Sequence, residues 1–180
     1  MFTAREKRKT NIAEYLIYMF QVEDIIRSMG FDIESIEKNI IGQYDLSYPE
    51  KREMREWYLS LIHILKAHDL EKIGHNPILK NIMDELNDLH VRLLSNPSEG
   101  EYFILHQDAK AAIYELRRKT PDNGRHEIEI CLDGLYGLLL LRLAKKQINP
   151  ETEKAFRLIS KMMAYLSAKY KLIDEGTAEI

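Results

Sequence analysis

The hydrophobic residues of this 180-residue chain recur mainly at steps of three and four, the spacing that places side chains on one face of an α-helix. Between about Thr10 and Met29 they form one such stripe, and Gly30 follows as a helix stop. The same spacing returns in five further long segments and one short one, and none looks like a strand. The pattern therefore predicts an all-α protein.

Helix caps and prolines indicate where the remaining helices begin and end. Ser47 with Glu50 and Ser98 with Glu101 have the capping-box spacing, and Asn76-Pro77 and Asn149-Pro150 pair an N-cap with a proline in the first turn. After the first long helix, we predict a short helix over about 33–41 and long helices from about 47 through 65, 76 to 95, 98 to 119, 126 to 146 and 149 to 170. Residues 120–124 are predicted to form a turn, and the tail to 180 to fray.

Short connections between long amphipathic helices favour antiparallel neighbours. We therefore expect a single domain over residues 1–180, built as an up-and-down bundle of about six main helices. The fifth helix, about 126–146, is apolar nearly all round, so we expect it at the centre of the bundle. Its leucines Leu138, Leu140, Leu141 and Leu143 point in different directions, so the alternative to a central position is a surface shared with a partner.

Composition and charge exclude several function classes. The net charge of -3 gives no global attraction to nucleic acid, and Glu6 interrupts the short basic run from Arg5 to Lys9, so nucleic-acid binding is not expected. The most apolar stretch has an uncharged run only from Gly134 to Leu141, too short to span a membrane. A charged N-terminus without an apolar centre and a single cysteine, Cys131, favour a soluble protein of the reducing cytoplasm.

Motifs for catalysis or metal binding are missing from the sequence. None of the six histidines follows an acid by three residues, and no two lie three or four apart, so neither a di-iron Glu-x-x-His pair nor a histidine pair on one helix can form. Phosphate-binding glycine loops and nucleophile elbows are also absent. We therefore predict no catalytic residue, cofactor or metal, and a metal site assembled from separate helices stays the open alternative.

Three polar residues fall inside apolar stripes, where a buried charge needs a partner. Glu23 lies on the stripe of the first long helix, Arg142 on that of the fifth and His90 on that of the third. We predict that Arg142 is buried and bonded to a carboxylate, with Glu23 the first choice, although Arg27 could hold Glu23 locally instead. Glu23 and Arg142 either fix helix register or, in the functional interpretation, line a small-molecule cavity with His90 and Tyr136. The alternative for His90 is a hydrogen-bonded core histidine.

Several sequence segments together give the chain a family resemblance. They are Ala4–Lys9 leading into Asn11–Leu16 and Gln21–Asp24, then Asp88–His90, Leu135–Gly137 with Leu141–Leu143, and Leu166–Tyr170. Over essentially its full length the chain resembles an uncharacterised bacterial all-helical family known only as a domain of unknown function. The resemblance implies a stand-alone cytoplasmic helical protein and brings no activity, cofactor or catalytic residue.

Two functions from different classes follow from these observations. The first is a non-enzymatic helical interaction protein that self-associates, as a dimer in the first instance, because the fifth helix has more apolar perimeter than a bundle edge needs. The alternative is a small-molecule-binding bundle whose internal pocket uses Glu23, His90, Tyr136 or Arg142. A cavity of at least about 300 Å³ that touches those residues would favour the alternative.

Overall fold

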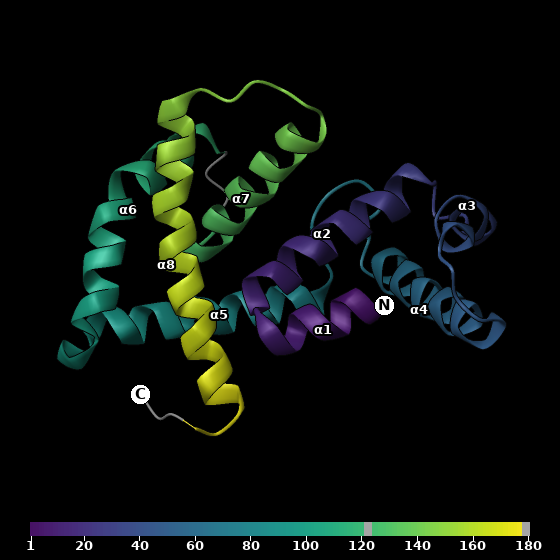
Figure 1. Ribbon diagram of the computed structural model, residues 1–180, viewed down its shortest axis with the longest axis horizontal. Helices are drawn as coiled ribbons and strands as arrows, with labels where there is room; N and C mark the ends of the chain where they lie inside the picture. The colour runs from purple at the N-terminus through teal and green to yellow at the C-terminus, as the bar shows by residue number, and fades with distance from the viewer. Residues whose placement is uncertain (121–123, 178–180) are drawn as a thin grey trace.

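The computed structural model describes residues 1–120 and 124–177, and this part of the chain forms helices and turns without a strand (Figure 1). Its eight α-helices are α1 (Phe2–Thr10), α2 (Ile12–Ser28), α3 (Ile33–Asn39), α4 (Tyr48–Ala67), α5 (Pro77–Ser95), α6 (Gly100–Lys119), α7 (Glu127–Leu143) and α8 (Pro150–Asp174). Short 3-10 turns cover Ile41–Gln43 and Pro97–Glu99. The all-α prediction is confirmed. The middle of the turn predicted at 120–124 and the last residues of the predicted tail lie outside the described residues.

Most of the predicted caps form. The side chains of the predicted caps Asn76 and Asn149, and also those of Asn11 and Asp32, each accept a hydrogen bond from a backbone N–H in the first turn of the helix that follows. Ser47 and Glu50 form the capping box at the start of α4. The capping box expected at Ser98 is wrong, because Asn96 caps a 3-10 turn there and α6 begins only at Gly100, without a side-chain cap.

The N-terminal region contains a helix that the apolar pattern did not predict. Residues Phe2–Thr10 form α1. The side chains of Ala4, within this helix, and of Met1, just before it, are buried. Asn11 is extended at φ -154° and caps α2, so the chain turns between two helices rather than beginning one at Thr10. The charges of α1 hide its periodicity, and α1 is held by packing on α2.

The helices gather in two groups (Figure 1). In one, α6 and α8 lie side by side, and α5 crosses both of them rather than running parallel to them. In the other, α3 and α4 lie at the opposite end of the molecule, and α1 and α2 lie between the two groups. The arrangement therefore departs from a simple up-and-down bundle, with eight helices in the described residues instead of six long ones and a short one.

Helix α7 is central over only part of its length. It packs against α2, α5, α6 and α8, and Ile128, Cys131 and Leu132 in its first half are completely buried. Its last turn extends beyond these neighbours, leaving Leu140 and Leu143 with 42% and 58% exposure. The predicted central helix is thus buried at its start and apolar but open at its end.

None of the helices in the described residues is both long and apolar enough to cross a bilayer.

Candidate functional site

Glu23 of α2 is completely buried and bonded to the segment that begins α5. Its Oε1 accepts hydrogen bonds from the backbone N–H of Asn76 at 3.0 Å and from Asn76 Nδ2 at 2.8 Å, and its Oε2 lies 2.7 Å from His75 Nδ1. The side chain of Asn76 also caps α5 by accepting from two backbone N–H groups of its first turn. One carboxylate therefore connects α2 to the N-terminus of α5, as buried charges require.

His75 is the charge partner of Glu23. Its ring stacks on Phe20, with the two ring centroids 3.7 Å apart, and its Nε2 lies 3.8 Å from Asp133 Oδ1 on α7. Burial lowers the pKa of His75, but the hydrogen bonds and charges of Asp133 and Glu23 outweigh burial and raise the pKa to about 9. His75 is therefore a cation at neutral pH, held between two carboxylates.

Tyr136 of α7 belongs to the same region. Its hydroxyl donates to Asp24 Oδ2 at 2.7 Å, and Asp24 pairs with Arg27 at 2.9 Å. Arg27 also donates to the carbonyls of Leu70 and Gly74 in the loop between α4 and α5. Arg27 therefore binds Asp24 and this loop, and the prediction that it could hold Glu23 is wrong.

The predicted ion pair between Arg142 and Glu23 is also wrong. Arg142 is exposed and has no ion-pair partner in the described part of the chain, whereas Glu23 is held by His75 and Asn76. Helix geometry returns Arg142 to the side of Leu138, as expected, but no neighbouring helix covers that last turn of α7. A helical stripe identifies the side on which a residue lies and not how far the covering helices extend.

His90 of α5 belongs to a second, separate cluster. Its Nδ1 lies 2.7 Å from the hydroxyl of Tyr102, and its Nε2 lies 3.5 Å from Glu127 Oε1. His106 of α6 brings its Nε2 to 2.8 Å from the same carboxylate oxygen, and the two imidazole centroids are 5.3 Å apart. Three helices therefore bring two imidazoles and one carboxylate together.

Burial lowers the pKa of His90 to about 4; Glu127 opposes this shift, and the electrostatic effect of His106 and His126 adds to it. Cys131, one turn after Glu127, is completely buried, and burial raises the pKa of its thiol. At neutral pH His90 is therefore neutral and Cys131 is a thiol, so the cluster offers no thiolate nucleophile.

The structure places the four predicted residues at three locations. Glu23 and Tyr136 share one network, in which Phe20 stacks on His75 and meets the Tyr136 ring edge-on with the centroids 5.9 Å apart. His90 and Arg142 each lie elsewhere.

Sequence reasoning missed His75, Asp133, Tyr102, His106 and Glu127, because their partners are on other helices. The one available signal was that His75 directly precedes the predicted N-cap of α5.

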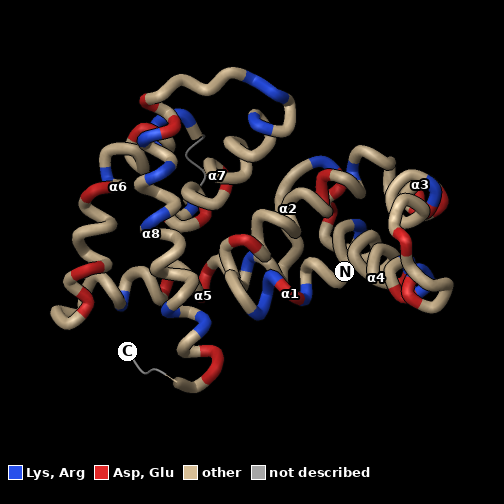
Figure 2. The backbone as a smooth tube through the Cα atoms, viewed as in Figure 1, with Lys and Arg blue, Asp and Glu red and all other residues tan. Residues whose placement is uncertain are grey.

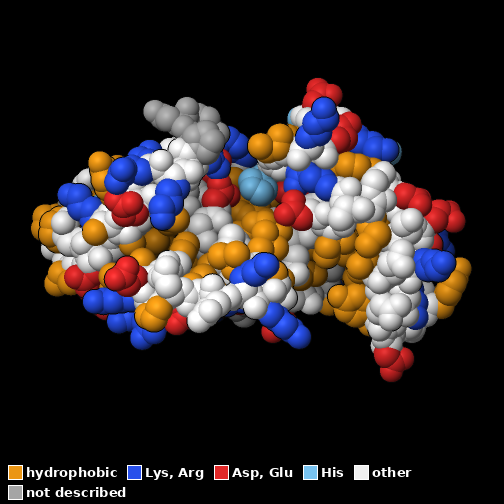
Figure 3. Space-filling model, turned by 90° about the horizontal axis from the view of Figure 1, so that it is seen from above, with side chains coloured by type: hydrophobic (Ala, Val, Ile, Leu, Met, Phe, Trp, Pro, Cys, Tyr) orange, Lys and Arg blue, Asp and Glu red, His pale blue; other side chains and the backbone are white. Residues whose placement is uncertain are grey.

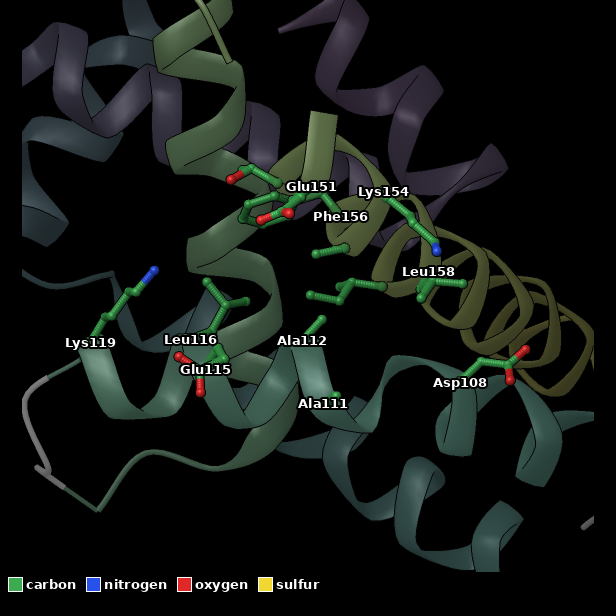
Figure 4. Close-up of a pocket in the computed structure, with 13 residues that line it drawn as sticks. Asp108, Ala111, Ala112, Glu115, Leu116, Lys119, Glu151, Lys154, Phe156 and Leu158 are labelled. Atoms are coloured by element: carbon green, nitrogen blue, oxygen red, sulfur yellow. The ribbon is translucent and has the colours of Figure 1, made fainter. Parts of the chain in front are cut away.

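A pocket with a mainly apolar lining belongs to neither cluster. A pocket of about 380 Å³ lies between α6 and α8, with Ala112, Leu116 and Phe156 directed into it and Lys119 and Glu151 toward its rim (Figure 4). Gly134 of α7 lies behind it, since a Cβ added there would come 2.8 Å from Leu116 Cδ1 and 3.1 Å from Phe156 Cε1. None of Glu23, His90, Tyr136 and Arg142 lines this pocket.

Comparison with known proteins gives one match. Neither the curated proteins nor the solved structures include a match to the chain. A family described as a domain of unknown function, DUF4924, matches residues 1–177, nearly the whole sequence and both clusters described above. The chain therefore belongs to the DUF4924 family, as its full-length resemblance to a family of unknown function indicated.

Proposed function

We propose that this protein is a non-enzymatic helical interaction protein that forms a homodimer through the exposed end of α7. The observation that carries the proposal is the apolar last turn of that helix, where Leu140, Leu141 and Leu143 are 42%, 45% and 58% exposed. In the view from above, hydrophobic side chains lie open between charged ones on the upper face of the molecule (Figure 3). Apolar side chains that a chain does not bury itself are typical of protein interfaces.

The charges around these leucines favour a second copy as the partner. Arg142, Lys145 and Lys146 lie at one end of the connection between α7 and α8, and Glu151 and Glu153 lie at the other (Figure 2). None of these five side chains forms an ion pair within the described residues. A two-fold axis perpendicular to the connection would place the basic end of one copy, with its leucines, opposite the acidic end of the other.

The expected affinity is modest. Complete burial of an exposed leucine contributes about 1.5 to 3 kcal/mol, so three half-exposed leucines on each of two copies contribute about 6 kcal/mol in total. Association costs an estimated 4 to 15 kcal/mol in lost freedom of motion. At the lower end of that cost the leucines leave about 2 kcal/mol, and exposed ion pairs of up to about 1 kcal/mol each would bring the Kd to the order of tens of micromolar or weaker.

Sedimentation velocity on the full chain between about 10 and 500 µM tests this proposal. We expect a concentration-dependent dimer that Leu143→Glu converts to a monomer while circular dichroism stays unchanged. Val91→Glu is the matched control, because Val91 is a 53% exposed apolar residue on another helix, α5. A wild-type chain that stays monomeric at 500 µM, or a Val91→Glu variant that loses the dimer equally, would contradict the proposal.

A bacterial, cytoplasmic origin forms part of the same proposal. Its support is the full-length family resemblance together with Cys131, which is buried and free and so is protected from disulfide formation with other molecules.

The second candidate function is small-molecule binding, favoured by the pocket between α6 and α8. Its volume of about 380 Å³ falls in the range of ligand sites, and its apolar floor with a charged rim suits a small amphipathic molecule. The fluorescent probe 1-anilinonaphthalene-8-sulfonate should bind the native protein, and Ala155→Phe, which fills the pocket, should abolish binding. Ala168→Phe, at an exposed alanine of the same helix, is the control. Equal fluorescence in both variants would exclude this pocket as the binding site.

A further inference from the structure

The cluster of His90, His106 and Glu127 has the composition and geometry of a metal site. One ligand atom from each residue can be chosen so that all three lie within 4.8 Å of one another. Two of the pairs are closer, with Glu127 Oε1 at 2.8 Å from His106 Nε2 and 3.5 Å from His90 Nε2. Donor atoms bound to one tetrahedral zinc ion are separated by roughly 3.4 Å, so small side-chain adjustments would complete the coordination.

We propose that His90, His106 and Glu127 bind one divalent transition-metal ion, with Zn²⁺ the first choice. Two imidazoles and one carboxylate suit zinc and its neighbours among the transition metals, whereas Mg²⁺ and Ca²⁺ require mainly oxygen ligands. The three ligands come from α5, α6 and α7, which is why no spacing in the sequence shows the site. The proposal goes beyond self-association and does not depend on it.

The surroundings of His90 support this assignment. Its Nδ1 lies 2.7 Å from the hydroxyl of the completely buried Tyr102, while its Nε2 faces Glu127. With a metal on Nε2, the Nδ1–H would donate to the Tyr102 oxygen, the kind of hydrogen bond that orients a metal-binding histidine. Tyr102 therefore acts as a positioning residue for His90.

The bonds within the protein do not fully satisfy His106. Within the described residues its Nδ1 is the one buried side-chain nitrogen or oxygen without a hydrogen-bond partner. A metal on Nε2 would leave this Nδ1 unbonded as well, so the support for His106 as a ligand is the position of its Nε2, 2.8 Å from Glu127 Oε1. His126, by contrast, is engaged at both nitrogens, accepting from the Glu129 N–H at Nδ1 and lying 3.1 Å from Asp84 at Nε2, and is no ligand.

The site is accessible to an ion from one side. A groove of about 490 Å³ between α6 and α7 is lined by Lys110, Tyr114 and Arg117 and reaches Glu127. The side chain of Glu127 is 27% exposed, whereas those of His90 and His106 are 6% and 12% exposed. Glu127 is therefore the ligand that the groove reaches, and water or a small anion there would complete the coordination of the ion.

Isothermal titration calorimetry of the chelator-treated full chain with ZnCl₂ tests the proposal. We expect one Zn²⁺ per chain, with affinity reduced at least about a hundredfold by Glu127→Gln or His106→Gln, since loss of a second-shell partner alone costs about 10- to 100-fold. Glu127→Gln is the more informative variant because a partly exposed residue in the first turn of α7 tolerates the change without loss of folding. Tyr102→Phe should weaken binding about tenfold.

His63→Gln is the matched control, since His63 is an exposed histidine of α4. The His63→Gln protein should bind zinc as the wild type does. In the wild-type protein, the imidazole ¹⁵N resonances of His90 and His106 should shift on addition of Zn²⁺, a readout that needs no substitution. The proposal is overturned if the wild type binds no Zn²⁺ at micromolar concentration, if the variants bind as the wild type does, or if the shifts occur at other histidines.

Discussion

The ion pair between His75 and Glu23 makes the stability of this protein depend on pH in a predictable direction. The structure raises the pKa of His75 from 6.5 to about 9, so the folded state binds a proton more tightly than the unfolded state. The resulting stabilisation is fully present below pH 6.5 and is lost as the pH rises through about 9. Because the His75 side chain is only 19% exposed, we expect about 2 to 3 kcal/mol of stability from this proton at pH 6.

Urea unfolding monitored by circular dichroism between pH 6 and pH 9.5 measures this contribution. The wild-type free energy of unfolding should fall by about 2 to 3 kcal/mol over this range relative to that of His75→Gln, which removes the titrating group and retains an amide that can donate to Glu23. The comparison between the two proteins is the measure, because burial lowers the pKa of the Met1 amine to about 6 and so raises the stability of both with pH.

The control for this experiment is His63→Gln, which removes an exposed histidine with no ion-pair partner in the described residues. It should lose stability with pH as the wild type does. A His75→Gln protein whose free energy of unfolding runs parallel to the wild-type curve from pH 6.5 to 9.5 would refute the assignment of a protonated His75 to the buried pair.

Four further predictions follow from the structure, each checked by thermal or urea unfolding at pH 7. Glu23→Leu should cost about 3 to 5 kcal/mol, because it leaves His75 and Asn76 without their buried acceptor. Arg142→Leu should change the free energy of unfolding by less than about 0.5 kcal/mol, because Arg142 is exposed, and a larger loss would revive a buried role. Gly137→Ala should stabilise α7 by about 0.5 to 1 kcal/mol because open space surrounds the added methyl, whereas the same change at Gly134 should bring no gain against Leu116. Asn149→Ala should cost about 1 kcal/mol through loss of the cap on α8, with a loss below about 0.3 kcal/mol counting against that cap.

The candidate sites show what a single sequence could indicate. Glu23 and His90 were identified because a polar residue inside an apolar stripe must be buried and satisfied, and both are buried and hydrogen-bonded. Arg142 satisfied the same criterion and is exposed, because the criterion gives direction around a helix and not position relative to its neighbours. His106 and Glu127 gave no signal at all, since neither shares a helix with its partners.

The sequence by itself determined the local structure of this protein. Periodicity of three and four, the caps at Asp32, Asn76 and Asn149, and Gly30 in the left-handed region at φ 63° depend on interactions within a few residues, so they can be identified along the chain. Only the tertiary structure decided which helices cross, how far α7 extends beyond its neighbours, and which side chains from α5, α6 and α7 meet. Those outcomes depend on contacts between residues distant in sequence, and the hydrophobic effect that drives them is non-directional.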